Sequence, residues 1–360
     1  MKKFSSLLTF ILILSIPVLS DDYLYSYKKT EESMIDDPIC RGQAILFSGN
    51  TNLPLAEAVA SYLDTPLGEA TIKCFNDGET SIQVKQSVRN KEVFILQSTC
   101  STDTQSVNDS IMELYLLVRT MKRASAATIT AIIPYYGYAR QDRKNTPRVP
   151  ISAADIALLL EVAGIDRIVT IDLHCGQIQG FFHNAPVDNL YAETMFVPYF
   201  AEKQLHNPVI VSPDAGGVDR AKKFQENLAR QGTSPRLAII SKQRAGAGVI
   251  EMMNLIGDVE GCDVIIVDDM CDTAGTLVQA AQLLRDKGAV RVFAAITHGV
   301  FSGPALDRIR HSVIEELVIS DTIPLKANAP ENIHCISIAP LLGEAIRRIY
   351  LGESVSSLFQ

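Results

Sequence analysis

The sequence predicts an α/β protein with parallel sheets that are covered by helices on both faces. From residue 44 onward, short apolar runs alternate with segments whose apolar residues recur at helical spacing. Runs such as Val93–Leu96 and Val264–Val267 are continuously hydrophobic, as expected for strands that are buried on both sides. Because the chain has 360 residues, more than a single domain usually contains, we expect two such sheets.

Each element follows from its own local pattern. Apolar residues at helical spacing predict helices over 53–63 and 108–121, and Ser152 followed by Asp155 resembles a capping box that opens a further helix. A strand–helix–strand pattern at 93–134 recurs at 264–297, which hints at an internal duplication, although any repeated unit of this kind would look the same. Strands are expected at the apolar runs 44–47, 93–96, 129–133, 168–171, 209–211, 237–240, 264–267 and 292–296.

The composition argues against several classes of protein. With 47% hydrophobic residues the chain can bury full cores, which excludes a disordered polypeptide. Its 33 basic and 41 acidic residues give a net charge of −8, which argues against a general binder of nucleic-acid backbones but leaves room for local basic pockets. The 7 cysteines form no CxxC pair, so neither a zinc knuckle nor a disulfide framework is indicated.

Residues 1–20 have the shape of a secretory signal. Two lysines precede an uncharged apolar run that ends in small residues, as expected for a signal peptidase substrate. The run is short for a membrane span of about 20 apolar residues and contains Pro17, which weakens the alternative of a membrane anchor. A mis-assigned start codon also stays open, because Met34 lies just before the first expected strand. The polar, Tyr-rich residues 21–41 are interpreted as a linker.

The stretch VIIVDDMCDTAGTL, residues 264–277, is the most informative about chemistry. A buried strand ends in Asp268 and Asp269 and leads through a small-residue turn into a helix. Such a turn presents backbone N–H groups to an anion, and Thr273 and Thr276 add hydroxyl donors. Vicinal carboxylates suit the paired hydroxyls of a sugar. The segment therefore indicates a site for a phosphorylated pentose, with a capped helix and an acidic strand end as the plainer alternative.

Two further segments carry groups that are able to bind a nucleotide. FNDGET, residues 75–80, places an aromatic ring and two carboxylates on one turn, where the ring can stack on a purine and the carboxylates can accept its amino hydrogens. YYGYARQDRK, residues 135–144, concentrates three cations after a strand, and guanidinium groups bind phosphate through two parallel hydrogen bonds. Taken alone, the first could be an ordinary surface turn and the second a solvated basic loop.

Three other positions stand where catalytic groups are often found. His174 and Asp214 each follow a strand directly, outside the carboxyl end where α/β proteins bind ligands, although a lone residue there is usually structural. KQRAGAG, residues 242–248, follows the strand expected at 237–240 and sets two cations before a run of Gly and Ala. That composition predicts a mobile flap that closes on a ligand, but a flexible basic loop is by itself poor evidence of catalysis.

These motifs together support a resemblance. The stretch 264–277 resembles the PRPP-binding motif of type I phosphoribosyltransferases, and the other motifs, in their order, narrow the resemblance to the class I ribose-phosphate pyrophosphokinase (PRPP synthetase) family over residues 42–360. The resemblance implies two tandem phosphoribosyltransferase-type domains, each a mostly parallel sheet flanked by helices. An ATP-binding domain would span 42–190 and a ribose-5-phosphate-binding domain 191–340, with a C-terminal helix at about 341–360 packed on the first.

The resemblance also implies an activity and its site. The reaction would be Mg²⁺-dependent transfer of the β,γ-diphosphoryl group of ATP to the C1 hydroxyl of D-ribose 5-phosphate, giving AMP and PRPP for nucleotide biosynthesis. Ribose 5-phosphate would bind at Asp268, Asp269, Asp272, Thr273, Ala274, Gly275 and Thr276. ATP would bind at Phe75, Asp77, Gly78, Glu79, Arg140 and Gln141.

The same resemblance assigns the catalytic cations and the metal ligands. Lys242 and Arg244 would close over the transferring group, although Gln243 and the Gly/Ala tail depart from the more basic, Pro-containing flap expected in the family. His174 and Asp214 would bind Mg²⁺. Because magnesium prefers oxygen ligands, Asp214 is the better supported of the two, and His174 could instead contact ATP phosphates.

Assembly and regulation follow from the resemblance alone. It implies homodimers stacked into hexamers, with inorganic phosphate as activator and ADP as inhibitor at an interface. Four residues resemble the anion site that would bind both effectors, although locally they are ordinary polar surface residues: Ser87, Arg89, Ser354 and Ser356.

Three rival functions and the localisation stay open at this point. A phosphoribosyltransferase that consumes PRPP would share the loop 268–276, a non-catalytic regulatory paralogue would be expected to lose the flap cations, and an exported binding protein is motivated only by the leader. ATP and ribose 5-phosphate are intracellular. We therefore expect a cytoplasmic protein if initiation is at Met34 or the leader is not used, and otherwise an ATP-containing organelle.

Overall fold

A computed structural model describes residues 43–243 and 252–358. The predicted leader and linker, and the predicted catalytic residue Arg244, lie outside the described residues, and only the backbone of Lys242 is described. Within the described ranges, no helix has both the length and the apolar character needed to cross a membrane.

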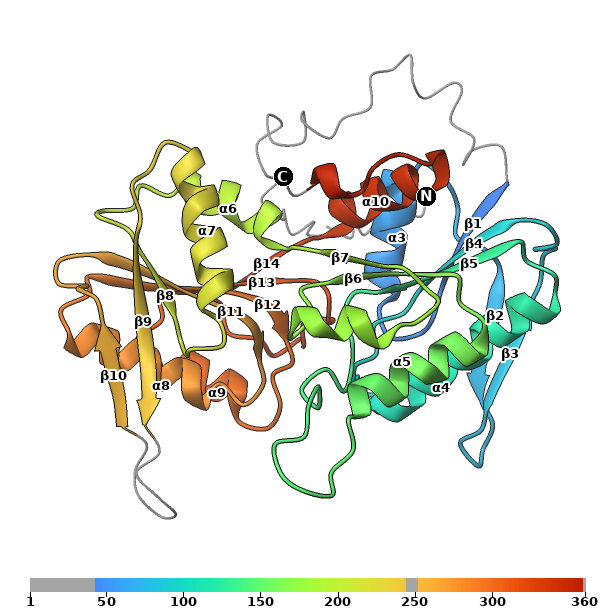
Figure 1. The fold of residues 1–360 in the computed structure, drawn as a ribbon, viewed down its shortest axis with the longest axis horizontal. Helices are drawn as coiled ribbons and strands as arrows, with labels where there is room; N and C mark the ends of the chain where they lie inside the picture. Colours follow the sequence, from blue (N-terminus) through green and yellow to red (C-terminus); the bar gives the residue numbers. More distant parts are fainter. Residues whose placement is uncertain (1–42, 244–251, 359–360) are drawn as a thin grey trace, which may run out of the picture. The chain divides into compact units, whose positions relative to one another are not determined.

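The first half of the chain forms a five-stranded parallel sheet in the order β1-β4-β5-β6-β7. Its strands are β1 (Ala44–Ser48), β4 (Glu92–Leu96), β5 (Thr128–Ile133), β6 (Arg167–Ile171) and β7 (Val187–Leu190). In Figure 1, helix α3 (Leu53–Tyr62) lies on one side of the sheet, and α4 (Val107–Arg123) and α5 (Ser152–Ala163) lie on the other. Helices on both faces bury the apolar strands, as the continuous hydrophobic runs predicted.

The second half forms a seven-stranded sheet in the order β10-β9-β8-β11-β12-β13-β14. Only the β9–β10 pair is antiparallel among the strands of this sheet that the structure describes. The strands are β8 (Val209–Ser212), β9 (Arg236–Gln243), β10 (Met252–Ile256), β11 (Asp263–Cys271), β12 (Arg291–Gly299), β13 (Glu316–Ser320) and β14 (Ile333–Ile336). The flanking helices are α6 (Glu193–Glu202), α7 (Val218–Arg230), α8 (Gly275–Asp286) and α9 (Ala305–Arg310).

Smaller elements complete the described chain. The antiparallel hairpin of β2 (Ala70–Cys74) and β3 (Thr80–Val84) separates α3 from β4 in sequence. A 3₁₀ turn, η2 (Gly176–Phe181), follows β6, and another, η3 (Ser356–Leu358), closes the described part. Helix α10 (Ala339–Leu351) packs against α3, and the contact is so close that a Cβ on Gly343 would lie 2.3 Å from Cδ1 of Tyr62.

The predicted α/β class is confirmed, but several predicted boundaries were wrong. Strand β11 runs to Cys271 instead of stopping at Val267, because β12 continues beside it and pairs Met270 with His298. Strand β9 includes Lys242, which was predicted to lie on a flap after the strand, because the antiparallel partner β10 places Met253 opposite it.

The predicted capping box was placed on the wrong helix. Ser152 is already inside α5, whose N-cap Ile151 makes no side-chain cap, and the Ser152 hydroxyl instead donates to the side-chain oxygen of Gln141. A capping box does begin α4, where Ser106 and Asp109 cap each other's backbone N–H groups. Tertiary contact with the loop after β5 therefore decides how Ser152 is used.

Buried polar contacts join the two sheets. Asp172, directly after β6, accepts a hydrogen bond from the hydroxyl of Thr297 on β12 at 2.7 Å. On the other side of the contact, Ser98 Oγ donates to the carbonyl oxygen of Thr322 at 2.5 Å and Asn52 Nδ2 donates to that of Asp321 at 2.7 Å. Because unpaired polar groups are costly in a buried region, these bonds define how the carboxyl ends of the two sheets face each other.

Candidate active site

The predicted sugar acids lie on β11, beyond its most apolar part. The strand residues Val264–Val267 are buried, and the side chains of Asp268 and Asp269 are 25% and 5% exposed. The backbone N–H of Asp269 donates to Oδ1 of Asp268 at 2.9 Å. The sequence placed these carboxylates at a strand end, whereas the structure places them on a strand that continues, so the backbone holds both of them firmly.

His174 reaches the same acids from the other sheet. His174 lies in the segment that follows β6, two residues after Asp172. Its Nδ1 lies 2.7 Å from Oδ2 of Asp269. This hydrogen bond raises the pKa of His174 above its ordinary value. The contact joins positions 95 residues apart, so local sequence patterns carried no signal for it.

Arg220, on the first turn of α7, is a site residue that the sequence reasoning missed. Its Nη1 lies 3.6 Å from Oδ1 of Asp268 and 3.4 Å from Oδ1 of Asp269. In the sequence Arg220 looks like any cation of an amphipathic helix. Its place three residues after the glycine pair of SPDAGG was the only signal that could have singled it out.

The two acids have opposite pKa shifts. Burial raises the pKa of Asp268 to about 8, and the negative charge of Asp269 adds to that rise. Burial acts in the same direction on Asp269, but the hydrogen bond with His174 and the charge of Arg220 outweigh it and lower its pKa below the usual range. The pair therefore combines an ionised Asp269 with an Asp268 that can carry a proton near neutral pH.

The turn of residues 272–276, called the phosphate loop because the sugar phosphate is predicted to bind there, has the geometry of an anion site. Ala274 adopts a left-handed backbone conformation (φ 59°) and is the N-cap of α8, so the first N–H groups of that helix face the turn. Nη1 of Arg308 donates to the carbonyl oxygen of Thr273 at 2.9 Å and supports the turn from α9. No side chain caps the helix within the described residues, which leaves its N-terminal donors available to a ligand.

One residue that was predicted to bind the nucleotide contacts this loop. Nη1 of Arg140, in the segment after β5, lies 2.5 Å from Oδ2 of Asp272. Gln141 is held beside it, because its backbone N–H donates to Tyr138 and its side chain accepts from Ser152. The predicted ATP-binding segment and the predicted sugar-phosphate loop are thus adjacent, although 132 residues separate the two partners in the chain.

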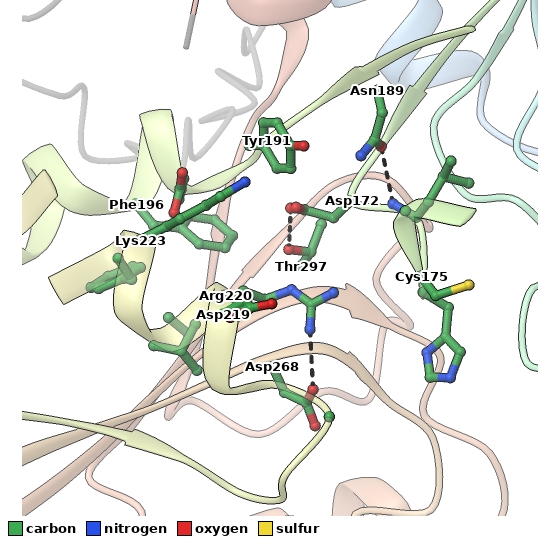
Figure 2. A pocket seen from close by; sticks show the side chains of 18 of the residues that line it. Asp172, Cys175, Asn189, Tyr191, Phe196, Asp219, Arg220, Lys223, Asp268 and Thr297 are labelled. Atoms are coloured by element: carbon green, nitrogen blue, oxygen red, sulfur yellow. Dashed lines mark hydrogen bonds and ion pairs between the residues drawn. The ribbon is translucent and has the colours of Figure 1, made fainter. Parts of the chain in front are cut away.

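A cavity of about 600 Å³ lies beside the acids. Figure 2 shows Arg220 and Asp268 on one side of it and Asp172 and Thr297 nearby. The lining also contains groups that the sequence analysis did not single out, among them Asn189, Tyr191, Glu193 and Lys223. Its size and polar lining are suited to a small charged molecule.

Asp214 lies on the turn between β8 and α7. Its Oδ1 accepts hydrogen bonds from the backbone N–H groups of Gly216 and Gly217 at 2.9 Å and 3.1 Å. The turn is tightly packed at Gly217, where a Cβ would lie 3.0 Å from the hydroxyl of Ser212. The charge of Asp214 also acts on Asp268, so the turn holds a third carboxylate near the acid pair of β11.

Other predicted site residues are not brought to the acids. Phe75, Asp77, Gly78 and Glu79 form the exposed tip of the β2–β3 hairpin, where Phe75 is 58% exposed, and Figure 1 shows this hairpin well away from α8. Across the described residues, no hydrogen bond or ion pair joins this tip to Arg140 or to the phosphate loop. Ser87, Arg89, Ser354 and Ser356 are all exposed, and none of the described contacts links the first two to the last two.

Comparison with known proteins identifies the family. Two family models match: the N-terminal domain of ribose phosphate pyrophosphokinase over residues 44–164, and the phosphoribosyl synthetase-associated domain over residues 247–360. The ribose-phosphate pyrophosphokinase of Campylobacter jejuni subsp. jejuni is 52% identical over 314 residues, which cover 87% of this chain and 98% of the relative. The chain belongs to the ribose-phosphate pyrophosphokinase family.

Further members of the ribose-phosphate pyrophosphokinase family support the assignment. The relative from Helicobacter pylori is 49% identical over 314 residues, covering 87% of this chain and 95% of its own length. The crystal structure of phosphoribosylpyrophosphate synthetase from Mycobacterium smegmatis aligns with a TM-score of 0.79 and 39% identity, covering 86% of this chain and 99% of that one. The predicted family and the predicted fold with its two phosphoribosyltransferase-type halves are confirmed, whereas the domain boundaries and the roles of individual residues stay predictions.

Ribose-phosphate pyrophosphokinases are Mg²⁺-dependent in general, and the residues here fit such an ion. The described residues contain no cluster of three or more His, Cys, Asp or Glu side chains that would form a cage by themselves. Magnesium, however, usually takes only one or two carboxylates and completes its shell with water and substrate phosphates. Within the described residues, the side-chain hydrogen bonds of Asp214 use only Oδ1 and those of His174 use only Nδ1. Oδ2 of Asp214 and Nε2 of His174 therefore stay available as metal ligands.

Proposed function

We propose that this chain transfers the β,γ-diphosphoryl group of ATP to the C1 hydroxyl of ribose 5-phosphate, giving AMP and PRPP. The observation that carries the proposal is the 2.5 Å contact between Arg140 and Asp272. It places a predicted ATP-binding cation beside the predicted sugar-phosphate loop, as a reaction between the two substrates requires. The curated relatives, ribose-phosphate pyrophosphokinases by name, support the same activity.

The sugar would bind between the acids and the loop. The N–H groups at the start of α8 and the hydroxyls of Thr273 and Thr276 would receive the 5-phosphate, since helix N-termini attract anions. The carboxylates of Asp268 and Asp269 would accept hydrogen bonds from the ring hydroxyls. These contacts fix the sugar so that its C1 hydroxyl faces the nucleotide.

Transfer of a phosphoryl group depends on positioning and on stabilising spread negative charge more than on covalent help. Arg140 and Gln141 would orient the ATP phosphates, and Lys242 and Arg244 would stabilise the negative charge on the transferring group. Mg²⁺ held by Asp214 and His174 would neutralise phosphate charge when bound.

The geometry also supports a homo-oligomer. The tip of the β2–β3 hairpin carries the predicted purine-binding group Phe75, but within the described chain it makes no contact with Arg140. If both groups bind one ATP molecule, the tip must come from a second copy of the chain. We propose such an assembly, with hexamers of stacked dimers as the expected form.

Regulation and localisation are further parts of the proposal. Ser87, Arg89, Ser354 and Ser356 would bind phosphate or ADP where copies of the chain meet, which agrees with their exposure in a single chain. The protein would act in the cytoplasm if translation starts at Met34 or the leader is not used, and in an ATP-containing organelle if the leader directs it there.

A coupled assay tests the proposed activity. Purified protein with ATP and Mg²⁺ should form AMP only when ribose 5-phosphate is present. AMP formation that does not depend on the sugar, or none under any condition, would contradict the proposal. The second outcome would instead favour a non-catalytic regulatory paralogue, which would still bind an active relative. Sequencing the N-terminus of the native protein would show whether residues 1–33 are retained.

A further inference from the structure

Arg220 occupies a central place in the acid cluster that the proposed chemistry does not use. It projects from the first turn of α7 into the cavity shown in Figure 2, and its side chain is only 20% exposed. The guanidinium nitrogen Nη1 lies between the two acids, 3.6 Å from Oδ1 of Asp268 and 3.4 Å from Oδ1 of Asp269. One cation therefore contacts both carboxylates that are proposed to hold the sugar.

The charge of Arg220 balances an unusual concentration of acids. The carboxylates that interact with it electrostatically include those of Asp172, Glu193, Asp214, Asp268 and Asp269. Buried carboxylates repel one another and are costly unless they are paired with a cation. Lys223, the other α7 cation that lines the cavity, instead lies 4.5 Å from the centre of the Tyr191 ring.

The contacts on Asp269 show how its direction is fixed. Oδ2 of Asp269 is held by His174 at 2.7 Å, and Oδ1 faces Arg220. Oδ1 of Asp268 is held by the backbone N–H of Asp269 and also faces Arg220. A guanidinium group is planar and presents its donors in fixed directions, so it restricts the rotation of both side chains more than a flexible ammonium group would.

We propose that Arg220 is a positioning residue of the sugar site, which orients the carboxylates of Asp268 and Asp269 toward the 2- and 3-hydroxyls of ribose 5-phosphate. The inference rests on the proposed function, because that function places the sugar diol on these two acids. Arg220 acts through the acids and does not itself contact the sugar. Its loss should therefore weaken recognition of the hydroxyls more than recognition of the nucleotide.

The test compares three variants. Arg220→Met removes the charge and keeps much of the length, and Arg220→Lys keeps the charge without the planar group. Lys222→Met is the matched control, because it removes one positive charge from the same helix at a side chain that is 62% exposed and pairs with Glu226 on the helix surface. Folding of each variant is checked by thermal melting, and activity is measured as AMP formation with ribose 5-phosphate and with 2-deoxyribose 5-phosphate.

The decisive readout is the discrimination between the two sugars, measured as the ratio of their kcat/KM values. Because hydrogen bonds to charged groups contribute strongly to recognition, Arg220→Met should raise the KM for ribose 5-phosphate at least about tenfold and lower the sugar discrimination by a similar factor. The KM for ATP should change by less than about twofold. Arg220→Lys should fall between Arg220→Met and the wild type, and Lys222→Met should match the wild type.

The possible failures are distinguishable. A wild-type protein that forms no AMP from ATP and ribose 5-phosphate contradicts the proposed function. An active wild type whose Arg220→Met variant loses activity equally with both sugars, or keeps full discrimination, overturns the role of Arg220 alone. If Arg220→Met does not fold, Arg220→Lys decides, and unchanged discrimination in that variant overturns the inference.

Discussion

Nδ1 of His174 lies 2.7 Å from Oδ2 of Asp269, although the first residue follows a strand of the five-stranded sheet and the second lies on a strand of the seven-stranded sheet. This hydrogen bond joins the two halves at the candidate active site. It couples the predicted metal and ATP region to the predicted sugar region, because each residue belongs to one of them.

The pair should behave as a unit in mutant kinetics. His174→Ala and Asp269→Asn should each lower kcat/KM, and the double variant should lose less than the sum of the two losses. Residues that share a hydrogen bond show interaction energies of about 0.5–3 kcal/mol in double-mutant cycles. The measurement is the AMP-forming assay on all four proteins, and additive losses would show that the contact is not used in catalysis.

Lys242 should be essential for turnover but not for folding. It lies at the end of β9, where the predicted catalytic flap begins. Removing one preorganised donor to a transition state costs about 3–4 kcal/mol, so Lys242→Ala should lose two or more decades of kcat. Circular dichroism should show an intact fold, and near-normal activity of the variant would remove Lys242 from the mechanism.

Mixed variants should reveal whether one site uses two copies of the chain. Phe75→Ala and Arg140→Ala should each be nearly inactive, because both groups are proposed to bind ATP. If the β2–β3 tip reaches the site from a second copy, mixing the two proteins under conditions that exchange subunits should restore part of the activity. Each variant mixed with itself is the control. Mixtures that stay as inactive as their components would favour a site built from a single chain.

Glu193 should make stability depend on pH. Burial raises its pKa from 4.5 to about 7, and the charge of Asp172 adds to the rise. An acid with a raised pKa in the folded state stabilises the fold most below its unfolded pKa, and this contribution is lost as pH rises from about 4.5 through 7, up to a limit of about 3 kcal/mol. Glu193→Gln stays neutral.

Thermal melting between pH 4.5 and 8 measures this effect. The wild type should lose more stability over the interval than Glu193→Gln does. Glu202→Gln, at the exposed end of the same helix, serves as the control and should follow the wild type. Parallel curves for the wild type and Glu193→Gln would show that the pKa of Glu193 is the same in the folded and unfolded states.

Gly343 should be needed where α10 packs on α3. A Cβ at this position would lie 2.3 Å from Cδ1 of Tyr62, too close for the two helices to stay in place. Overpacking of this kind costs about 1–3 kcal/mol, so Gly343→Ala should lower the free energy of unfolding by that amount. Gly180→Ala is the comparison, because nothing lies within 4 Å of the Cβ it would add. Equal stability of the two variants would contradict the close packing.

Local patterns in the sequence determined the class of fold, most strands and the family, and they predicted the phosphate loop. Continuous apolar runs predict buried parallel strands because a strand between two helical layers has no polar face. The acids Asp268 and Asp269 and the turn to Gly275 could be read because strand, turn and helix N-terminus are neighbours in the chain. The ends of strands were predicted less well. Strand β11 is longer than predicted, because its length depends on pairing with the neighbouring strand β12.

Only the tertiary structure decided which groups meet. The contacts of His174 with Asp269, of Arg140 with Asp272 and of Asp172 with Thr297 each join residues 95 or more positions apart. No local periodicity encodes such pairs, because they depend on how two separately folded sheets present their carboxyl ends to each other. Arg220 is the clearest case: the sequence shows a helical cation, and burial among several carboxylates makes it part of the site.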